Sequence, residues 1–411
     1  MKINKHCFPN GLRLVHYEDT STQMVALNIV YDVGARDEHP EHTGFAHLFE
    51  HLMFGGSAHI PDYDTPLQLA GGENNAWTNN DITNYYLTVP KPNVETAFWL
   101  ESDRMLELAF SEQSLEVQRG VVMEEFKQRC FNQPYGDVGH LFRPLAFRVH
   151  PYRWPTIGKE LSHIEQATLD EVKSFFYRFY APNNAVLAVT GNISWDETVK
   201  LTEKWFAPIP RRDVPVRQLP QEPEQTQERR LTVERNVPLD ALFMGYHMCS
   251  REGADYYAFD ILSDILSNGR SSRLNRRLVQ EQNIFSGIDA YISGTRDAGL
   301  LQISGKPAAG VSLEQAEAAV RKELEELQRS PVDGQELEKV KNKFESTQIF
   351  GNINYLNVAT NLAWFELTGK AEDIDLEVER YRSVTTEQLH TVAQRTFCES
   401  NAVVLYYKSD K

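Results

Sequence analysis

The sequence predicts two related, layered domains of the α+β or α/β class. The chain has 411 residues, whereas a single domain commonly has about 100–200. Hydrophobic residues make up 41% of the chain and charged residues 24%, which is typical of a globular protein with enough apolar material for two cores. Strand-like and helix-like stretches occur in both halves, and this mixture predicts sheets that are covered by helices.

A duplication is indicated by a helix start and a strand that recur together. Residues 168–171, Thr-Leu-Asp-Glu, form a capping box, in which the Thr hydroxyl and the Glu carboxylate bind free N–H groups of the first helical turn. A strand-like run at 184–190 follows. The same two features recur at Thr385 and at residues 401–407, both 217 residues later. A repeat of this length indicates a duplicated domain rather than a solenoid unit.

The boundary between the halves is predicted at residues 218–230. This stretch is polar, contains two prolines and has no apolar periodicity, which is typical of a linker. We therefore expect an N-terminal domain over residues 1–217 and a related C-terminal domain over residues 231–411. Strand-like runs at 12–16 and 25–31 belong to the first domain, and a strand at 231–233 and a capped helix at 312–329 belong to the second.

The acidic composition limits the partners that the chain can bind. Its formal net charge is -16, with 58 acidic and 42 basic residues, which argues against nucleic acid. The charge suits a basic partner such as a cationic peptide, or it serves solubility alone. No stretch has the ~18 consecutive apolar residues of a membrane span, and the N-terminus lacks the apolar core of a signal peptide. We expect a cytoplasmic location by default, or a periplasmic location if a leader has been removed.

A metal site is predicted in the apolar segment from Thr43 to Ser57. His47 and His51 are four residues apart, so on a helix both imidazoles lie on one face, and Glu50 leans toward that face. The residues around them are mostly Phe, Leu and Met, so we expect the helix to be buried. A buried polar group without a partner costs about 1–3 kcal/mol. A bound metal explains all three groups at once; core histidines that bond to backbone carbonyls are the alternative.

The third metal ligand is expected from a second helix, because catalytic zinc sites combine three protein ligands with one open position. Residues 114–129 have helical composition and offer Glu124 and Glu125. Glu125 lies four residues after Val121 and three after Val122, on a stripe that we expect to face inward, so it is the better candidate. Glu124 lies closer to the polar flank. No cysteine is near the two histidines in the sequence, which argues against a closed structural zinc site.

These motifs resemble those of the inverzincin peptidases, the family that includes insulin-degrading enzyme, pitrilysin and the mitochondrial processing peptidase. The resemblance rests on His47-x-x-Glu50-His51, on the distant Glu that ends residues 119–125, and on Asn-Ala-Trp-Thr at 75–78 followed by Thr-Asn-Tyr-Tyr at 83–86. It covers nearly the whole chain, whose length is similar to that of the half-length, processing-peptidase type of subunit.

For the site, the resemblance implies one Zn²⁺ per chain, bound by His47, His51 and Glu125. Glu50 would be the general base of a zinc metalloendopeptidase and would take a proton from the attacking water.

For the fold, the resemblance implies an α+β chain of two homologous domains, each a mainly antiparallel β-sheet flanked by α-helices. Asn75, Ala76 and Trp77 would lie in an edge strand that binds the peptide substrate as an added β-strand. Two subunits would enclose a chamber that admits short or unfolded peptides.

Three positions depart from the family's pattern. Gln118 stands where many members carry an auxiliary Glu seven residues before the third ligand, and weaker support of the ligands would loosen zinc. Val279 and Ser286 stand where members carry an Arg and a Tyr that help to hold the substrate. We therefore expect a second, metal-free family subunit to supply this pair in a heterodimer. A homodimer with altered substrate contacts is the alternative.

The C-terminal half lacks the metal motif. Alignment of Gly269 with Gly56 places Asp260, Ser263 and Asp264 opposite the three motif residues, and this trio is no zinc site. One metal per chain is therefore expected. The rival function is a non-catalytic or weakly active assembly subunit of a peptidase complex, and the intact motif in the first half argues against it.

Overall fold

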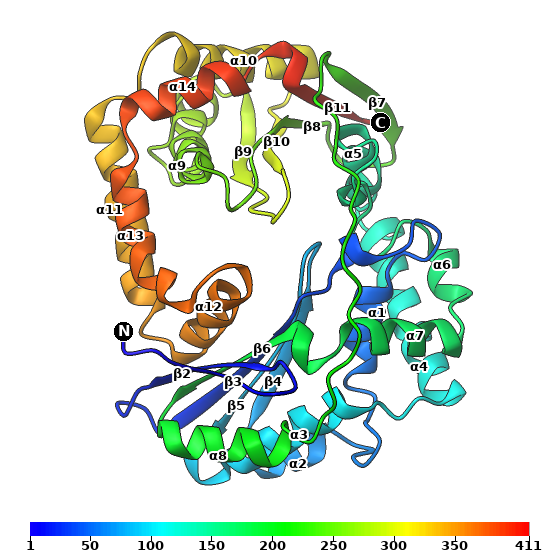
Figure 1. Cartoon of the computed structure of the whole chain (residues 1–411). Helices are drawn as coiled ribbons and strands as arrows, with labels where there is room; N and C mark the ends of the chain where they lie inside the picture. The colour runs from blue at the N-terminus through cyan, green and yellow to red at the C-terminus, as the bar shows by residue number, and fades with distance from the viewer. Residues whose placement is uncertain (411) are drawn as a thin grey trace. The chain divides into compact units, whose positions relative to one another are not determined.

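The computed structural model describes residues 1–410, and these divide into two compact units (Figure 1). Each unit combines one β-sheet with flanking helices, which confirms the predicted α+β class. Neither unit is one continuous stretch of chain. Unit 1 contains Met1–Arg129, Trp154–Pro220 and Ile349–Leu376, and unit 2 contains Cys130–Arg153, Gln221–Gln348 and the chain from Glu377 onward.

The sheet of unit 1 has six strands, and all but one of its neighbouring pairs are antiparallel. Strands β2 and β6 form the parallel pair. Strand β4 lies at one edge and pairs with β5 so that Trp77 is opposite Asn84. The strands are, in spatial order, β1 (Asn4–Cys7), β2 (Arg13–Glu18), β6 (Ala185–Gly191), β3 (Met24–Tyr31), β5 (Thr83–Pro90) and β4 (Glu73–Thr78).

Helices cover both faces of this sheet (Figure 1). On one face, α12 packs on β2, β3 and β6 through an apolar stripe that includes Val358 and Leu362, and this packing explains why residues 349–376 join unit 1. The other face is covered by α3 and α8. The helices of the unit are α1 (Phe45–Leu52), α2 (Asp64–Leu69), α3 (Val94–Leu106), α4 (Glu112–Phe126), α6 (Leu161–Glu165), α7 (Leu169–Phe179), α8 (Trp195–Trp205) and α12 (Tyr355–Thr368).

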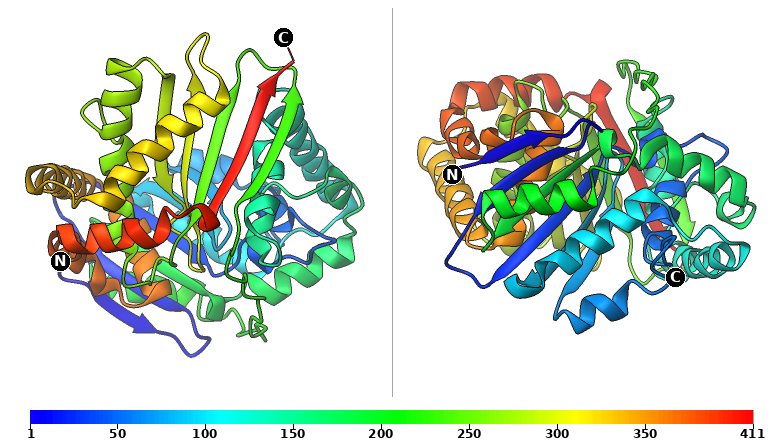
Figure 2. Two further views of the ribbon diagram at one scale, coloured as in Figure 1. Left: turned by 90° about the horizontal axis from the view of Figure 1, so that it is seen from above. Right: turned by 60° about the horizontal axis from the view of Figure 1, so that its bottom comes forward.

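The sheet of unit 2 repeats five strands of the first. Its order is β7–β11–β8–β10–β9, with a parallel pair between β7 and β11, as in the β2–β6–β3–β5–β4 part of unit 1. Figure 2 shows β7 and β11 side by side. Its strands are β7 (Arg229–Arg235), β11 (Ala402–Ser409), β8 (Ala241–His247), β10 (Leu300–Pro307) and β9 (Phe285–Ile292).

The two faces of the second sheet are also covered. Val404 points into the core with α9, α10 and α14, whereas its neighbours Val403 and Leu405 point into the core with α5, as the alternation of side chains along a strand requires. The predicted capping features are present at Thr168 and Thr385, the N-caps of equivalent helices. The helices are α5 (Val138–Ala146), α9 (Tyr256–Ser267), α10 (Leu313–Arg329), α11 (Gly334–Gly351), whose last three residues belong to unit 1, α13 (Glu377–Ser383) and α14 (Thr386–Thr396).

The segment before β7 is irregular. Residues 210–228 form neither helix nor strand, and β7 begins at Arg229, inside the stretch predicted as a linker. Residues 349–376 lie after that stretch in the chain and join unit 1. We propose that, along the chain, the N-terminal domain covers residues 1–217, the linker residues 218–230 and the C-terminal domain residues 231–411.

Candidate metal centre

The helix that carries the two histidines is fixed at its N-terminus by a buried carboxyl group. Gly44, the N-cap of α1, has a left-handed backbone with φ 89° and offers no side-chain cap. The Glu38 carboxyl group takes this role, accepting hydrogen bonds of 2.9 Å from the amides of Gly44 and Ala46. Burial raises the pKa of Glu38 to about 8, although both hydrogen bonds oppose the rise. The start of α1, just before His47, therefore depends on the Glu38 carboxyl group.

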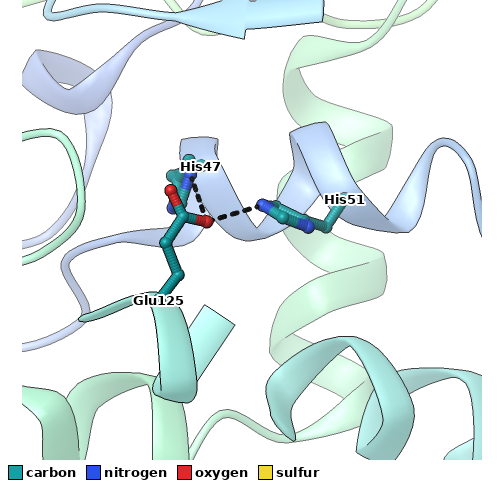
Figure 3. A group of neighbouring side chains, drawn as sticks. All are labelled: His47, His51 and Glu125. Atoms are coloured by element: carbon teal, nitrogen blue, oxygen red, sulfur yellow. Dashed lines mark ion pairs between the residues drawn. The ribbon is translucent and has the colours of Figure 1, made fainter. Parts of the chain in front are cut away.

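The structure brings the three predicted ligands together. Figure 3 shows His47 and His51 on successive turns of α1 with their rings directed at the carboxylate of Glu125. The Nε2 atoms of His47 and His51 lie 3.5 Å and 3.2 Å from Glu125 Oε2. One donor atom from each residue lies within 4.8 Å of the other two. In residues 1–410 this is the one group of His, Cys, Asp and Glu side chains arranged to hold a metal ion.

Only one of the two valines expected to share an inward stripe with Glu125 is buried. Val122 is fully buried on α4, as expected, but Val121 is 46% exposed, so its assignment to the inward stripe was wrong. The buried face of α4 runs through Leu115, Val122 and Phe126, and Val121 lies one residue beyond it. Glu125 lies at the edge of that face, where it is partly buried. Glu124 is exposed and pairs with Lys127 at 2.6 Å, away from the histidines.

His47 and Glu125 have the protonation states that metal binding needs. Burial lowers the pKa of His47 to about 4, so the imidazole is neutral at pH 7. A hydrogen bond from His51 lowers the pKa of Glu125, which keeps its carboxylate ionised. Arg129 approaches the other oxygen, Oε1, of Glu125 at 2.7 Å. Neutral imidazole and ionised carboxylate are the metal-binding forms of these groups.

The two nitrogen–oxygen separations suit a tetrahedral zinc ion. Zinc bonds of about 2.0–2.1 Å to nitrogen and oxygen place tetrahedral donors roughly 3.3–3.5 Å apart. The two nitrogen–oxygen distances, 3.5 Å and 3.2 Å, agree with that separation before any ion is considered. Two histidines and one carboxylate also match the ligand set of a catalytic zinc site, which keeps its fourth position open.

Glu50 lies beside the ligand group without belonging to it. It is on α1, one residue before His51, and is partly buried. Burial raises the pKa of Glu50, and the hydroxyl of Thr78 lowers it. A carboxyl group with a raised pKa next to a metal site is suited to accept and release a proton.

The predicted substrate residues lie on the edge strand β4. Asn75 and Trp77 are on its exposed face, with 36% of Trp77 accessible, whereas Ala76 packs against the core of unit 1. Strand β4 pairs with β5 on one side, and in residues 1–410 no strand pairs with its other side. Its outward N–H and C=O groups are therefore placed to bind an extended peptide.

In unit 2, the two positions that depart from the family's pattern make structural contacts. Val279 packs against the core, and the Ser286 hydroxyl donates to the carbonyl of Lys306 at 3.1 Å. The trio that replaces the metal motif is also engaged: Asp260 accepts from the Tyr381 hydroxyl, Ser263 donates to the Asp260 carbonyl, and Asp264 accepts from Asn268. In unit 1, Gln118 lies on α4 near Gly55, which follows the metal helix.

Sequence reasoning missed Glu38, Thr78 and Arg129. Arg129 lies four residues after Glu125, so the helical i,i+4 rule points to it. Glu38 is only six residues before the N-cap Gly44, but its spacing matches no capping motif, and Thr78 comes from the separate strand β4. No helix in residues 1–410 is long and apolar enough to cross a membrane.

Comparison with known proteins identifies similar sequences over most of the chain. Residues 13–135 match the family described as Insulinase (Peptidase family M16), and residues 166–344 match its partner, described as Peptidase M16 inactive domain. The zinc protease PqqE of Helicobacter pylori is 26% identical over 405 residues, covering 97% of this chain and 91% of the relative. The uncharacterized zinc protease YmxG of Bacillus subtilis is 25% identical over 407 residues, covering 98% of each chain.

Solved structures share the fold over the full length. The crystal structure of a protease from Helicobacter pylori has a TM-score of 0.94 at 26% sequence identity, covering 99% of both chains. A peptidase M16 inactive domain from Pseudomonas fluorescens has a TM-score of 0.90 at 16% identity, covering 100% of this chain and 99% of that one. The second likeness concerns the fold alone.

Proposed function

Because the chain belongs to the insulinase family of M16 peptidases, as a single half-size subunit, we propose that it is a zinc metalloendopeptidase. One Zn²⁺ per chain is bound by His47, His51 and Glu125. The observation that carries this proposal is the convergence of their three donor atoms, which lie within 4.8 Å of one another, with the two histidine nitrogens 3.5 Å and 3.2 Å from Glu125 Oε2. The names of relatives as zinc proteases support the choice of metal.

Catalysis in this proposal depends on Glu50. When bound, zinc lowers the pKa of a water molecule and polarises the scissile carbonyl group. The Glu50 carboxylate accepts the proton of the attacking water and later donates it to the leaving amine. Burial raises the pKa of Glu50, which favours the first transfer because a stronger base accepts a proton more readily.

The substrate in this proposal is a short or unfolded peptide. It adds to the free edge of β4 as a further strand, so that its main chain bonds to the strand of Asn75, Ala76 and Trp77. Main-chain recognition tolerates many side chains, and a folded protein does not offer a free strand of this kind. Two subunits enclose the chamber in which the peptide is cut.

The partner in this proposal is a second, metal-free family subunit. The absence of an Arg and a Tyr at these positions supports it, because Val279 packs against the core and the Ser286 hydroxyl is bonded to the Lys306 carbonyl. A homodimer is the alternative. Co-purification with a related chain supports the heterodimer, and full peptidase activity of the isolated chain contradicts it.

A non-catalytic or weakly active assembly subunit is the second candidate function. Gln118 in place of an acidic residue beside the metal helix is the observation that favours it, because outer support commonly changes metal affinity by 10–100-fold. Metal content separates the two candidates. About one zinc per chain in metal-replete protein supports the enzyme, and protein without bound zinc supports the assembly role.

The function is tested by digestion of a peptide library with and without a metal chelator, first with the isolated chain and then with any co-purifying homologue. We expect cleavage that the chelator abolishes and that zinc restores. Glu50→Gln should retain zinc and lose turnover, by about 10²–10⁴-fold for loss of a general base. Normal hydrolysis by this variant contradicts the role of Glu50.

A further inference from the structure

The sheet of unit 2 carries a cavity on the face that α10 and α14 cover. Its volume is about 420 Å³, and it lies between α10, the beginning of β7, Tyr246 of β8 and the turn that leads from α14 into β11. Pockets that hold small molecules commonly have volumes of this size. Every residue that lines the cavity belongs to unit 2, and none of them is a proposed metal ligand.

One wall of the cavity is a closed network of two acidic and two basic side chains. Glu317 of α10 accepts hydrogen bonds from Arg230 at 2.7 Å and 2.8 Å and from Arg321 at 2.7 Å. Glu228 also accepts hydrogen bonds from both arginines. Burial alone would raise the pKa of Glu317, but the hydrogen bonds from Arg230, Tyr406 and Arg321 lower it to about 2. Each guanidinium group thus has two carboxylate partners, so this wall is neutral overall and does not select an anion.

The hydroxyl group of Tyr246 opens into this cavity without a protein partner. Only 1% of Tyr246 is exposed, and its ring packs in the core of unit 2, with its centre 5.3 Å from that of the Phe397 ring. The hydroxyl group has no hydrogen-bond partner among residues 1–410, yet it is not one of the polar atoms that the interior seals completely, so the cavity is its outlet. Burial raises the pKa of Tyr246, so the hydroxyl group stays protonated at pH 7. A buried polar group of this kind binds water or a ligand.

The rest of the lining is acidic and apolar. Glu399 is exposed and forms no ion pair with any residue of the described range. Glu325 pairs with Arg329, which lies outside the cavity. The buried side chains of Phe397 and Leu324 form the apolar part. A ligand that suits this lining carries a positive charge, N–H groups that donate to hydroxyl or carboxylate oxygens, and a short apolar stem.

We propose that this cavity binds a primary ammonium group on an aliphatic stem, which belongs to a small amine or to a lysine side chain. The ammonium group donates a hydrogen bond to the Tyr246 hydroxyl oxygen, and the Glu399 carboxylate attracts its charge. The stem packs against Phe397 and Leu324. Within residues 1–410 the acidic side chains of this cavity are not arranged to hold a metal ion, which leaves an organic cation as the ligand. The proposal does not rest on the peptidase function.

Binding is measured by the protection of a thiol group. Cys398 lines the cavity and is partly buried, whereas Cys7 is exposed in unit 1. The full chain is alkylated with iodoacetamide, and the modification of each cysteine is followed by mass spectrometry. At a concentration of n-pentylammonium of about ten times Kd, alkylation of Cys398 should slow by about tenfold, and that of Cys7 should not change.

Three further compounds separate the source of the ammonium group and the role of its charge. Nα-acetyl-lysine amide carries the same group on a peptide unit. Protection by n-pentylammonium alone supports a small amine as the ligand, and protection by the lysine compound, alone or as well, supports a lysine side chain. 1-Pentanol and pentanoate keep the stem without the positive charge and should not protect Cys398. Equal protection by either of them, or no protection by both ammonium compounds, overturns the proposal.

Tyr246→Phe keeps the aromatic ring in the core and removes the hydroxyl group. This variant should raise the Kd for n-pentylammonium by at least about tenfold, because a hydrogen bond to a charged group is lost. Glu399→Gln should raise the Kd less, because the carboxylate is exposed. Glu379→Gln is the matched control: Glu379 is another exposed carboxylate of unit 2 without an ion pair in the described range, it lies outside the cavity, and its loss should not change the Kd.

An unchanged Kd in Tyr246→Phe overturns the proposal. If Tyr246→Phe does not fold, the comparison of Glu399→Gln with Glu379→Gln decides, and equal Kd values in these two variants overturn it. Glu50→Gln should bind n-pentylammonium as the wild type does, because no residue of the cavity belongs to the metal site. Loss of amine binding in Glu50→Gln contradicts a site confined to unit 2.

Discussion

Bound zinc should stabilise unit 1 selectively, because all three proposed ligands lie in that unit. The perturbation is removal of the metal by a chelator, followed by return of zinc at a buffered free concentration. An ion that binds the folded state and not the unfolded state raises the free energy of unfolding by RT ln(1 + [L]/Kd). The effect does not depend on peptidase activity.

The size of the effect follows from the size of the unit. At a free zinc concentration of about 100 times Kd, the gain is about 2.7 kcal/mol. Unit 1 contains roughly 220 residues, and at this size a change of ~1 kcal/mol shifts Tm by about 2–4 °C. We therefore expect the Tm of unit 1 to rise by about 5–11 °C on zinc binding.

Tryptophan fluorescence is the assay, because every tryptophan of the chain belongs to unit 1. The six residues are Trp77, Trp99, Trp154, Trp195, Trp205 and Trp364. A fluorescence melt therefore follows the unfolding of the metal-bearing unit, whereas circular dichroism follows both units.

Three variants test whether the shift in Tm comes from zinc bound by the proposed ligands. Glu50→Gln keeps the ligands and should show the full shift. Glu125→Gln removes a ligand and should show a small shift, whereas Glu124→Gln removes an exposed carboxylate that pairs with Lys127 and should show the full shift. Equal shifts in the Glu124 and Glu125 variants refute the ligand assignment. An unchanged wild-type Tm refutes the zinc site.

Three further predictions follow from single contacts. Arg129→Ala should weaken zinc binding by about tenfold in a chelator competition, because Arg129 holds the outer oxygen of Glu125; unchanged affinity contradicts this role. Glu38 should make the free energy of unfolding fall as pH rises from about 4.5 to about 8, because the folded state keeps a proton that the unfolded state releases in this window. Urea unfolding at pH 5 and pH 8 measures the fall, which should be smaller in Glu38→Gln. Leu362→Ala should destabilise unit 1 by about 2–5 kcal/mol in the fluorescence melt, because it leaves a cavity between α12 and the sheet; an unaltered fluorescence transition contradicts the packing of α12 there.

The helix with the two histidines was predictable because its signal is local. His47 and His51 are one turn apart, and an apolar helix that carries polar groups at that spacing has few explanations other than a metal. The repeat at an offset of 217 residues was predictable for a similar reason, since capping residues and strand alternation are short patterns. These features need no knowledge of the rest of the chain.

The position of Glu125 beside the histidines could not be predicted from local sequence patterns alone. Its distance from the histidines in the sequence is set by the whole arrangement of α1 and α4, and periodicity placed Val121 on the wrong side of α4. Glu125 lies beside the histidines because it follows the buried Val122 by three residues on the same helix. The burial of Val122 alone indicates which face of α4 carries Glu125. The remaining support for Glu125 as a ligand came from the resemblance to a known family.

The position of α12 shows what a local pattern omits. Its buried residues, which include Val358, Leu362 and Leu367, recur at helical spacing, so a helix with one apolar face is expected there. The pattern does not say which sheet covers that face. Chain order favours the sheet of the second half, yet the helix packs on β2, β3 and β6. These strands expose an apolar face made by Val15, Ala26 and Val186, and α12 covers it. Such a helix can be assigned to a sheet only when it is known which distant sheet has an apolar face to bury. That becomes evident only when the whole fold is assembled.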